Sequence, residues 1–245
     1  MANLRTNNLS GEQGQNAYRG SVFFNGGSDS LVIPASSDFA YGTGDFTIEA
    51  WIWKDARPAT GETRGIFTQT QSGNDYIVFK VGSTNNIQAT FGSTTISTTG
   101  TLAVDSWNHV AVSRSSNTIK VFLNGIASSG STVSTDFSDT TRNPTIGNYT
   151  HSYGSLPYYG YISNLRVTKG EALYTADFTP PTTELTADAN TVLLCCQDSD
   201  DPTQEATGKT ITANGSTSLV NRTDNLIKNG RFTVSATENW TLSGG

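Results

Sequence analysis

Residues 149–159 form a short segment that is rich in side chains suited to carbohydrate recognition. The segment contains Tyr149, His151, Tyr153, Tyr158 and Tyr159. Aromatic rings stack against the C–H groups of sugars, and the polar atoms of Tyr and His can bond to sugar hydroxyls. The same residue types are also common in protein–protein interfaces. The segment is therefore predicted to bind a glycan or a partner, with packing on its own domain or on a sister subunit as the alternative.

The chain lacks an obvious catalytic arrangement. Glycoside hydrolysis requires two carboxylates that flank the scissile bond, but Glu49 is the only carboxylate on the predicted strand 46–53. His109 lies within another predicted strand, where a satisfied hydrogen bond is its ordinary role. A polar loop holds a second group of carboxylates, which a solvated turn explains: Asp198, Asp200 and Asp201. No Ser-His-Asp arrangement or phosphate-binding loop is recognisable, so the chain is not predicted to be an enzyme.

The two cysteines of the chain, Cys195 and Cys196, are adjacent. They lie in the apolar run 190–197, which predicts a buried strand. In a strand, neighbouring side chains point to opposite faces, so we expect two reduced, buried hydrophobic residues. A vicinal redox switch or a metal-binding pair is the alternative. The lack of a disulfide framework fits synthesis in a reducing cytoplasm.

The composition favours strands and turns over helices. The chain has 37 Thr and 24 Gly but only 7 Glu and 6 Lys, and Thr favours strands while Glu and Lys favour helices. The net charge of −6 argues against binding to nucleic acid. No apolar run approaches the ~18 residues of a membrane span, and the first residues lack the apolar core of a signal peptide.

Short strands with turns between them recur along most of the chain. Residues 46–53 alternate, with Phe46, Ile48, Ala50 and Ile52 on one face. Further strands are expected at 21–25, 29–34, 64–70, 75–81, 86–91, 107–114, 118–123, 158–168 and 190–197. Asn124-Gly125 predicts a two-residue hairpin turn, and 171–174 resembles one helical turn. This pattern predicts an all-β jelly-roll sandwich of two antiparallel sheets.

The ends of the chain differ in character from its centre. Residues 1–20 are polar and are expected to form an extended arm or anchor. The sandwich is expected over 21–197, and a connector with peripheral strands over 198–223. Residues 224–245 are expected to form a linker or the first strand of an incomplete following module.

Several segments resemble a known superfamily. The segments 27–34 and 39–53, followed by 105–125 with Trp107-Asn108-His109-Val110 and the Asn124-Gly125 turn, resemble the laminin-G-like branch of the concanavalin A-like lectin/glucanase superfamily. Residues 159–167 are similar to the closing strand of that branch. The resemblance covers about residues 21–197 and implies the jelly-roll sandwich.

A second, narrower resemblance concerns a possible setting for the protein. The segments 164–175, 177–181 and 193–196 resemble laminin-G-like domains in structural proteins of marine bacteriophages, especially cyanophages. The segment 225–232 is similar to the first strand of jelly-roll modules found in such appendage proteins. The resemblance implies a virion location after synthesis in the host bacterial cytoplasm, with other virion proteins as partners.

The resemblance to the superfamily also suggests two site types. Bacterial glucanases of this superfamily carry Glu-x-Asp-x-x-Glu on one strand, and the chain has no such string. Many laminin-G-like domains bind one Ca²⁺ at the rim of the sandwich, and Ca²⁺ requires 6–8 oxygen ligands. The candidate ligands here are Asp75, Asp136, Asp139 and Asn143. Without a dense acidic loop, calcium is the weaker expectation and no cofactor is the main one.

Three functions remain open. The first is a phage virion structural protein, such as a fibre, head-decoration or tail appendage subunit, which displays a lectin-like sandwich and attaches to host-surface glycan. Such proteins are usually symmetric oligomers, so a homotrimer is expected. The second is a secreted or cell-surface carbohydrate-binding module or adhesin. The third is a glycoside hydrolase, which would need two carboxylates facing each other across a groove.

Overall fold

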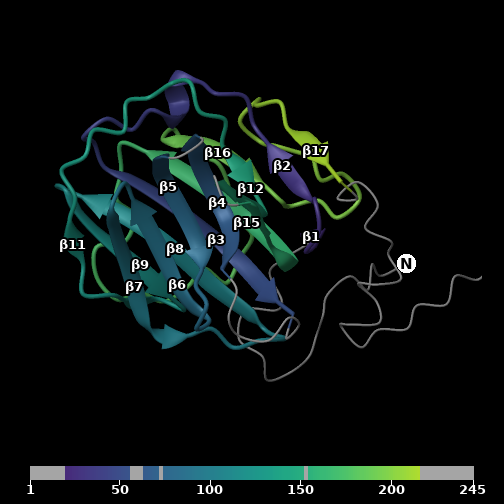
Figure 1. Ribbon diagram of the computed structural model, residues 1–245, viewed down its shortest axis with the longest axis horizontal. Coiled ribbons are helices and arrows are strands. Elements are labelled where there is room, and N and C mark those ends of the chain that lie inside the picture. Colours follow the sequence, from purple (N-terminus) through teal and green to yellow (C-terminus); the bar gives the residue numbers. More distant parts are fainter. Residues whose placement is uncertain (1–19, 56–62, 72–73, 152–153, 216–245) are drawn as a thin grey trace, which may run out of the picture.

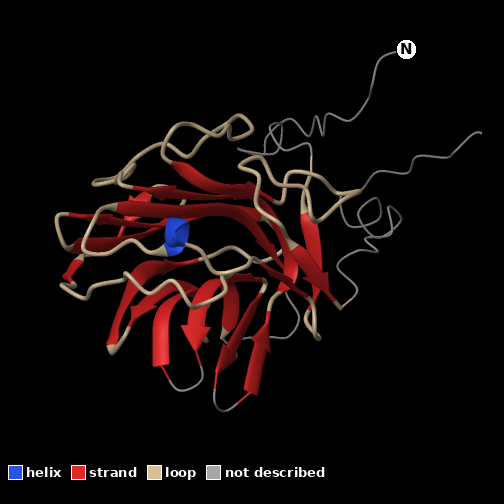
Figure 2. Ribbon diagram, turned by 90° about the horizontal axis from the view of Figure 1, so that it is seen from above, coloured by secondary structure: helices blue, strands red, loops and turns tan. Residues whose placement is uncertain are grey.

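The computed structural model describes residues 20–55, 63–71, 74–151 and 154–215. These residues form two large antiparallel sheets that are stacked face to face (Figures 1 and 2). The expected arm at the N-terminus and the expected module over 224–245 lie outside the described residues, except for Gly20. The expectation of an all-β sandwich of two antiparallel sheets is confirmed. No helix in the described ranges is long and apolar enough to cross a membrane.

Sheet 1 contains the strands that carry most of the sequence motifs. Its order is β1 (Val22–Asn25), β15 (Tyr159–Lys169), β3 (Phe46–Lys54), β8 (Trp107–Ser115), β9 (Thr118–Leu123) and β10 (Ile126–Ala127). Two further strands join this path, β16 (Thr191–Cys195) beside β15 and β11 (Ser131–Thr132) beside β9. β15 is long enough to pair with β1 through its first half and with β16 through its second half.

Sheet 2 faces sheet 1 across the core. Its order is β17 (Thr212–Asn214), β2 (Ser30–Val32), β12 (Thr145–Ile146), β4 (Arg64–Gln71), β5 (Asn74–Val81), β6 (Asn86–Phe91) and β7 (Thr94–Thr101). A separate hairpin consists of β13 (Asn148–His151) and β14 (Gly154–Pro157). A single 3-10 turn, η1 (Ser37–Phe39), is the one helical element among the described residues. Figure 1 shows β6 and β7 at one side of the molecule and β2 and β17 at the other.

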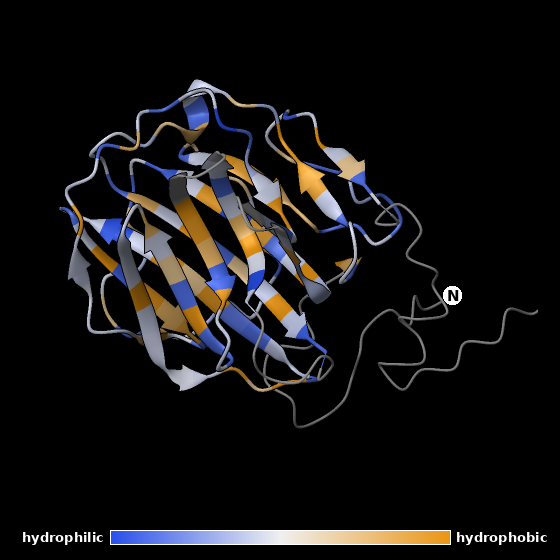
Figure 3. Ribbon diagram, viewed as in Figure 1, coloured by the Kyte–Doolittle hydropathy of each residue, from blue (hydrophilic) through white to orange (hydrophobic). Residues whose placement is uncertain are grey.

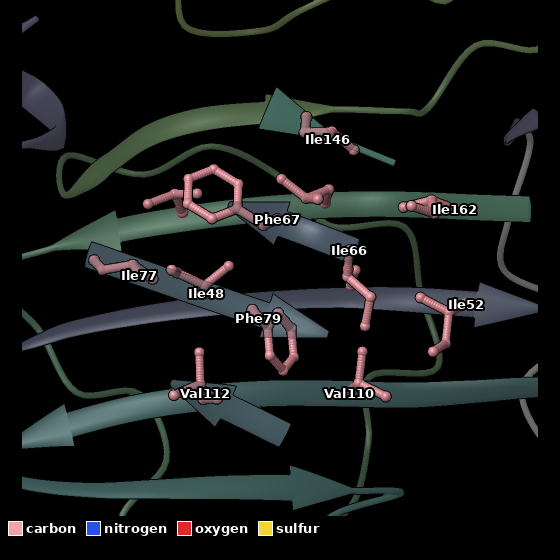
Figure 4. Close-up of a cluster of buried hydrophobic side chains, with 14 of the residues drawn as sticks. Ile48, Ile52, Ile66, Phe67, Ile77, Phe79, Val110, Val112, Ile146 and Ile162 are labelled. Atoms are coloured by element: carbon pink, nitrogen blue, oxygen red, sulfur yellow. The ribbon is translucent and has the colours of Figure 1, made fainter. Parts of the chain in front are cut away.

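The core lies between the two sheets and follows the alternation predicted for residues 46–53. Ile48 and Ile52 of β3 are completely buried. Figure 4 shows them facing Ile66 of β4 and Phe79 of β5, with Val110 of β8 nearby. Because strand residues alternate between faces, the opposite side of β3 carries Thr47, Glu49, Trp51 and Trp53 on the outer face of sheet 1.

The β9–β10 turn agrees with the sequence, whereas several other elements were not predicted. Asn124 and Gly125 have φ values of 51° and 82°, as the turn between β9 and β10 requires. By contrast, β7 was not predicted, because its run of Thr and Ser has little hydrophobic alternation. The segment at 148–157, expected to be a loop, is the hairpin β13–β14.

A segment of irregular backbone, residues 170–187, crosses the outer face of sheet 1; we call it the strap. It is anchored by backbone hydrogen bonds, from Gly170 N–H to the Asp45 carbonyl (2.8 Å) and from Phe178 N–H to the Gly125 carbonyl (2.9 Å). The helical turn expected at 171–174 is wrong, since these residues have no helical hydrogen bonding. The Leu173 N–H is instead turned toward sheet 1, where it donates to Thr47 Oγ1 (2.9 Å).

Candidate functional site

The outer face of sheet 2 presents two rows of polar side chains across neighbouring strands. One row places Lys80 of β5 beside Gln88 of β6 and Ser97 of β7. These three side chains are partly exposed. The next row includes Thr90 and Thr95, whose hydroxyls are 2.9 Å apart. The rows bring an ammonium, an amide and several hydroxyls onto one face, and such groups can bond to sugar hydroxyls.

The hairpin β13–β14 lies over the same face, above β4. Thr68 Oγ1 of β4 donates to the Asn148 carbonyl (3.0 Å). Gly65 of β4 has no side chain, and a Cβ at this position would collide with the backbone of Asn148 and Tyr149. Glycine therefore permits the close approach of the hairpin to the sheet. This contact fixes the position of the hairpin residues that lie beside Lys80.

Tyr149 is the residue of the expected tyrosine site that lies on this face. The Lys80 ammonium is 5.5 Å from the centre of its ring, within the range of a cation–π interaction. Tyr149 is only 7% exposed, so most of its ring surface supports Lys80 and the hairpin. His151 of β13 pairs through its backbone with Gly154, but its side chain and all of Tyr153 lie outside what the structure describes.

Tyr158 was expected to contact glycan, and its position corrects that expectation. Its side chain is 0% exposed and belongs to the hydrophobic core. The ring packs edge-on against Phe24, with centroids 6.3 Å apart. The hydroxyl has no hydrogen-bond partner within the described part of the chain, and burial raises the pKa of Tyr158 well above its ordinary value. A residue enclosed in this way has no surface for a ligand.

Tyr159 lies on the opposite side of the molecule from Tyr149, on the outer face of sheet 1. It packs edge-on against Phe23 of β1 (5.9 Å between ring centres). Phe23 also begins a row of aromatic cross-strand neighbours that continues through Tyr161, Trp53 and Trp107. Adjacent rings in this row are tilted or edge-on, at 4.9 Å for Phe23–Tyr161 and 6.0 Å for Trp53–Trp107. The described tyrosines of the 149–159 segment, Tyr149, Tyr158 and Tyr159, are thus divided between two faces and the core.

Glu49 of β3 does not stand alone, because three side chains share its carboxylate. Arg166 of β15 donates to Oε1 through Nε (2.8 Å) and Nη2 (2.6 Å). Oε2 accepts from Tyr174 Oη of the strap (2.7 Å) and lies 3.1 Å from His109 Nε2 of β8. Glu49 and His109 are both 0% exposed. Both oxygens of the Glu49 carboxylate are therefore engaged by side chains of the protein rather than available to a substrate.

The electrostatics of this group favour an ionised Glu49 at neutral pH. Burial by itself would raise the pKa of Glu49, but the interactions with His109, Arg166 and Tyr174 together hold it below its ordinary value of 4.5. Burial and the adjacent Glu49 carboxylate raise the pKa of Tyr174. Both pKa shifts favour the same protonation states, in which an ionised Glu49 carboxylate accepts a hydrogen bond from the neutral Tyr174 phenol.

Aromatic packing encloses the Glu49 group under the strap. Tyr174 and Phe178 are stacked, with centroids 3.7 Å apart and planes inclined by 5°. Both rings lie edge-on to His109, at 6.1 Å and 5.6 Å. His109 Nδ1 is buried without a hydrogen-bond partner among the residues described. The strap therefore closes this part of the outer face of sheet 1.

The concanavalin A-like lectin/glucanase superfamily model matches residues 25–176. This match begins at the last residue of β1 and ends within the strap, and it covers more than half of the chain. The chain belongs to this superfamily. No curated protein is significantly similar to it in sequence.

Solved structures of other superfamily-like sandwiches agree with the fold. A Bacteroides ovatus protein, described as a candidate carbohydrate-binding protein, superimposes with a TM-score of 0.60 at 20% identity. That match covers 80% of this chain and 59% of the Bacteroides protein, so the chain spans less than two thirds of it. A heptameric SAP-like pentraxin from Limulus polyphemus has a TM-score of 0.51 at 16% identity, with 79% of this chain and 93% of the pentraxin covered. At these identities the similarity concerns the fold.

Two of the calcium ligands expected from the laminin-G-like branch of the superfamily, Asp139 and Asn143, are engaged in hydrogen bonds within the protein. Asp139 accepts from Thr141 Oγ1 (2.6 Å) and Arg142 Nε (2.5 Å), and these contacts lower the pKa of Asp139 to about 2. Asn143 Oδ1 accepts from the Ala35 N–H (2.8 Å). Asp136 is exposed, and the side chain of Asp75 is not among those described. The described residues contain no group of three His, Cys, Asp or Glu suited to a metal.

The acidic loop and the cysteines have structural roles. Asp198 Oδ1 accepts from the Asp200 and Asp201 N–H groups (2.7 and 3.2 Å), as the predicted turn requires. Cys195 and Cys196 are both free and 1% exposed. They do not point to opposite faces, because Cys196 has φ +61°; this conformation turns both side chains into the core, with their sulfurs 3.8 Å apart.

Several residues of the candidate face were not found from the sequence. Lys80 and Gln88 occupy alternate positions against buried residues of β5 and β6, and this period of two is the signal that marks them as outward-facing. Gly65 has no comparable signal, because its role depends on a hairpin more than 80 residues later in the chain. The partners of Glu49 come from segments far from it in the sequence: sheet register brings Arg166 and His109 to it, and the strap brings Tyr174.

Proposed function

We propose that this chain is a non-enzymatic glycan-binding module whose ligand lies on the outer face of sheet 2. The observation that carries the proposal is the exposed polar surface of Lys80, Gln88, Thr95 and Ser97, which are adjacent across β5, β6 and β7. Hydroxyl, amide and ammonium groups suit a polyhydroxylated ligand, because together they can donate hydrogen bonds to its hydroxyls and accept hydrogen bonds from them. The hairpin β13–β14 borders this surface at Tyr149.

The two outer faces of the sandwich differ in how available they are. On sheet 1 the strap covers Glu49 and His109, and the neighbouring aromatic rings pack against one another. On sheet 2 Lys80, Gln88 and Ser97 are partly exposed and Thr95 is exposed, whereas Thr90 is buried. The fold of the Bacteroides protein, described as a candidate carbohydrate-binding protein, is consistent with glycan binding by this sandwich.

A binding role without hydrolysis is supported by the state of Glu49. Hydrolysis would need an accessible pair of carboxylates, one acid and one nucleophile or base. Glu49 is fully buried and bonded to Arg166 and Tyr174. The partly exposed carboxylate of Asp198 is used to form a turn.

The first experiment compares variants on a microarray of neutral and acidic oligosaccharides, followed by titration calorimetry with the oligosaccharide that binds best. Replacing Gln88 by Ala in combination with Lys80→Ala should weaken binding by roughly tenfold or more, since two hydrogen-bonding groups are lost. Tyr159→Phe is the matched control, because Tyr159 lies on the opposite sheet. Release of reducing sugar from the bound oligosaccharide, measured in parallel, should not exceed the background rate.

Two results would contradict the proposal. One is a folded wild-type chain that binds no oligosaccharide on the array. The other is equal loss of affinity in the double variant and in the Tyr159→Phe control, because the ligand would then not be on sheet 2. Hydrolysis of the bound sugar would favour the glycosidase alternative instead.

We further propose that the module is displayed by a phage virion, as part of a fibre, head-decoration or tail appendage. Support comes from the segments 164–175 and 177–181, which resemble laminin-G-like domains of marine phage structural proteins. In the structure these segments form the second half of β15 and part of the strap. The resemblance therefore includes the irregular segment that crosses the outer face of sheet 1. Immunogold labelling of purified virions with antibody against residues 21–197 should place gold at one fixed site. Label only in the medium or on cells would favour the secreted or cell-surface module.

A further inference from the structure

Strand β7 forms one edge of sheet 2, and it is long for an edge strand. It has eight residues, whereas the other outermost strands of the two sheets are shorter, with two residues in β10, three in β17 and four in β1. β7 pairs with β6 on one side, and no strand of the described ranges pairs with its other side. Proteins usually protect long edges with charges, prolines or short strands.

The hairpin register shows which backbone groups of β7 face outward. β6 and β7 are joined by the two-residue turn Gly92-Ser93, with Phe91 opposite Thr94. In such a hairpin the pair next to the turn exchanges hydrogen bonds, and the pattern then alternates. The N–H and C=O groups of Thr95 and Ser97 therefore point away from β6, toward the free edge.

The region around β7 is electrically neutral in an acidic chain. Residues 81–104 contain no charged side chain, although the whole chain carries a net charge of −6. In Figure 3, β7 carries none of the deep blue of charged residues. Val104, which follows β7, is 39% exposed and is one of two large hydrophobic residues that the described part leaves exposed. Two copies of this chain can meet at this edge without charge repulsion between the side chains of β7.

We propose that β7 pairs antiparallel with β7 of a second copy of the chain, about a twofold axis. An antiparallel edge is complementary to itself, so Thr and Ser of one copy meet Thr and Ser of the other, and each backbone group gains a partner. The pairing joins the two copies of sheet 2 into one continuous sheet. It also places the exposed polar rows of both copies side by side on a common face. The proposal concerns assembly and does not require that the face bind glycan.

The test measures the mass of the 245-residue chain by sedimentation velocity over a range of micromolar concentrations. The wild type should reach twice its chain mass of 26.1 kDa. Ser97→Pro removes the outward N–H and places a ring at the edge, where proline is tolerated because no internal hydrogen bond is lost. This variant should sediment as a single chain, with a dimer dissociation constant raised roughly tenfold or more.

Ser97→Ala is the matched control, because it removes the same hydroxyl and keeps the N–H; it should dimerise like the wild type. If Ser97→Pro fails to fold, Thr95→Lys provides a second test. It places like charges near each other across the twofold axis, so its dimer should be weak at low salt and recover at high salt. Amide hydrogen exchange supplies a residue-level readout, since Thr95 and Ser97 should become protected as the concentration rises.

Three outcomes would overturn the proposal. A wild type that remains a single chain at every concentration shows that the edge does not pair. An assembly of three chains has the wrong symmetry, since antiparallel pairing about a twofold axis closes at two copies. A folded Ser97→Pro variant that dimerises as strongly as Ser97→Ala places the interface elsewhere.

Discussion

Glu49 illustrates how a residue type that suggests catalysis can instead stabilise a fold. A carboxylate on a lectin-like strand invites comparison with a glycosidase, but here four hydrogen-bonding contacts, from Arg166, Tyr174 and His109, converge on it. A buried charge is tolerated when its oxygens are fully satisfied. The same contacts join β3, β8, β15 and the strap. Their loss should therefore lower the stability of the fold rather than an activity.

We expect Glu49→Gln to lower the free energy of unfolding by about 3–5 kcal/mol, because the buried His109 and the partly buried Arg166 would lose a charged partner. Equilibrium unfolding in urea measures this change. Asp139→Asn is the control, since it interrupts the surface pair with Arg142 and should cost less than about 1 kcal/mol. Equal effects of the two substitutions would show that the Glu49 group does not stabilise the sandwich.

The Glu49→Gln variant also tests how the free energy of unfolding depends on pH. The pKa of Glu49 is lower in the folded chain than its ordinary value of 4.5, so the stability that it contributes is fully present above that value. This contribution is lost as the pH falls through the folded-state pKa. The difference in unfolding free energy between the wild type and Glu49→Gln should therefore be constant near neutral pH and narrow below pH 4.5. A difference that grows in acid would contradict the assignment of an ionised Glu49.

At the scale of elements, the strap shows how irregular backbone is held against a sheet. The Phe178 N–H donates to the Gly125 carbonyl in the β9–β10 turn (2.9 Å), and Ala127 N–H donates to Asp177 Oδ1 (2.9 Å). The stacked rings of Tyr174 and Phe178 then cover His109. The turn therefore has two roles, since it reverses the chain and supports the strap.

Gly125→Ala should be more destabilising than Gly170→Ala, although both glycines have left-handed backbone, with φ of 82° and 86°. Each substitution bears the left-handed strain of about 1–2 kcal/mol. Only at Gly125 would the new Cβ also collide with the Phe178 carbonyl, whereas Gly170 has open space. Thermal unfolding of the two variants makes the comparison. Equal melting temperatures would mean that the strap does not rest on the turn.

At the scale of the whole molecule, the two sheets share one core and should unfold together. Ile77 and Phe79 of β5 pack with Ile48 of β3 across the interface. Neither sheet 1 nor sheet 2 can bury its apolar face without the other, so neither sheet is expected to be stable alone. The polar outer face of sheet 2 and the strap on sheet 1 thus rest on a single folding unit.

Ile77→Val, in sheet 2, should lower the free energy of unfolding by about 0.5–1.5 kcal/mol. The free energy obtained from the tryptophan fluorescence transition should fall by the same amount. The described tryptophans, Trp51, Trp53 and Trp107, all lie on sheet 1, so fluorescence reports the opposite sheet. Far-UV circular dichroism, recorded in the same urea titration, should give a coincident transition. Separate transitions would show that the sheets unfold independently.

The sequence by itself determined the class of fold and most of the strands, because these depend on local properties. The alternation in 46–53 and the Asn124-Gly125 turn act within a few residues, and the structure confirms both. The strand β7 was missed because Thr and Ser carry little hydrophobic signal, although its edge position exposes the groups that support our dimer proposal. The superfamily was identified from the same local motifs, and its match over residues 25–176 agrees.

Only the tertiary structure decided where the candidate functional residues lie. Tyr149, Tyr158 and Tyr159 are close in sequence, yet one borders sheet 2, one is in the core and one lies on sheet 1. Strand residues alternate between faces and a hairpin reverses the chain, so proximity along the chain does not imply a common surface. Conversely, Glu49 meets Arg166 because strand register pairs β3 with β15, and it meets Tyr174 because the strap crosses the outer face of sheet 1. Contacts of this kind depend on long-range pairing, which the local sequence does not encode.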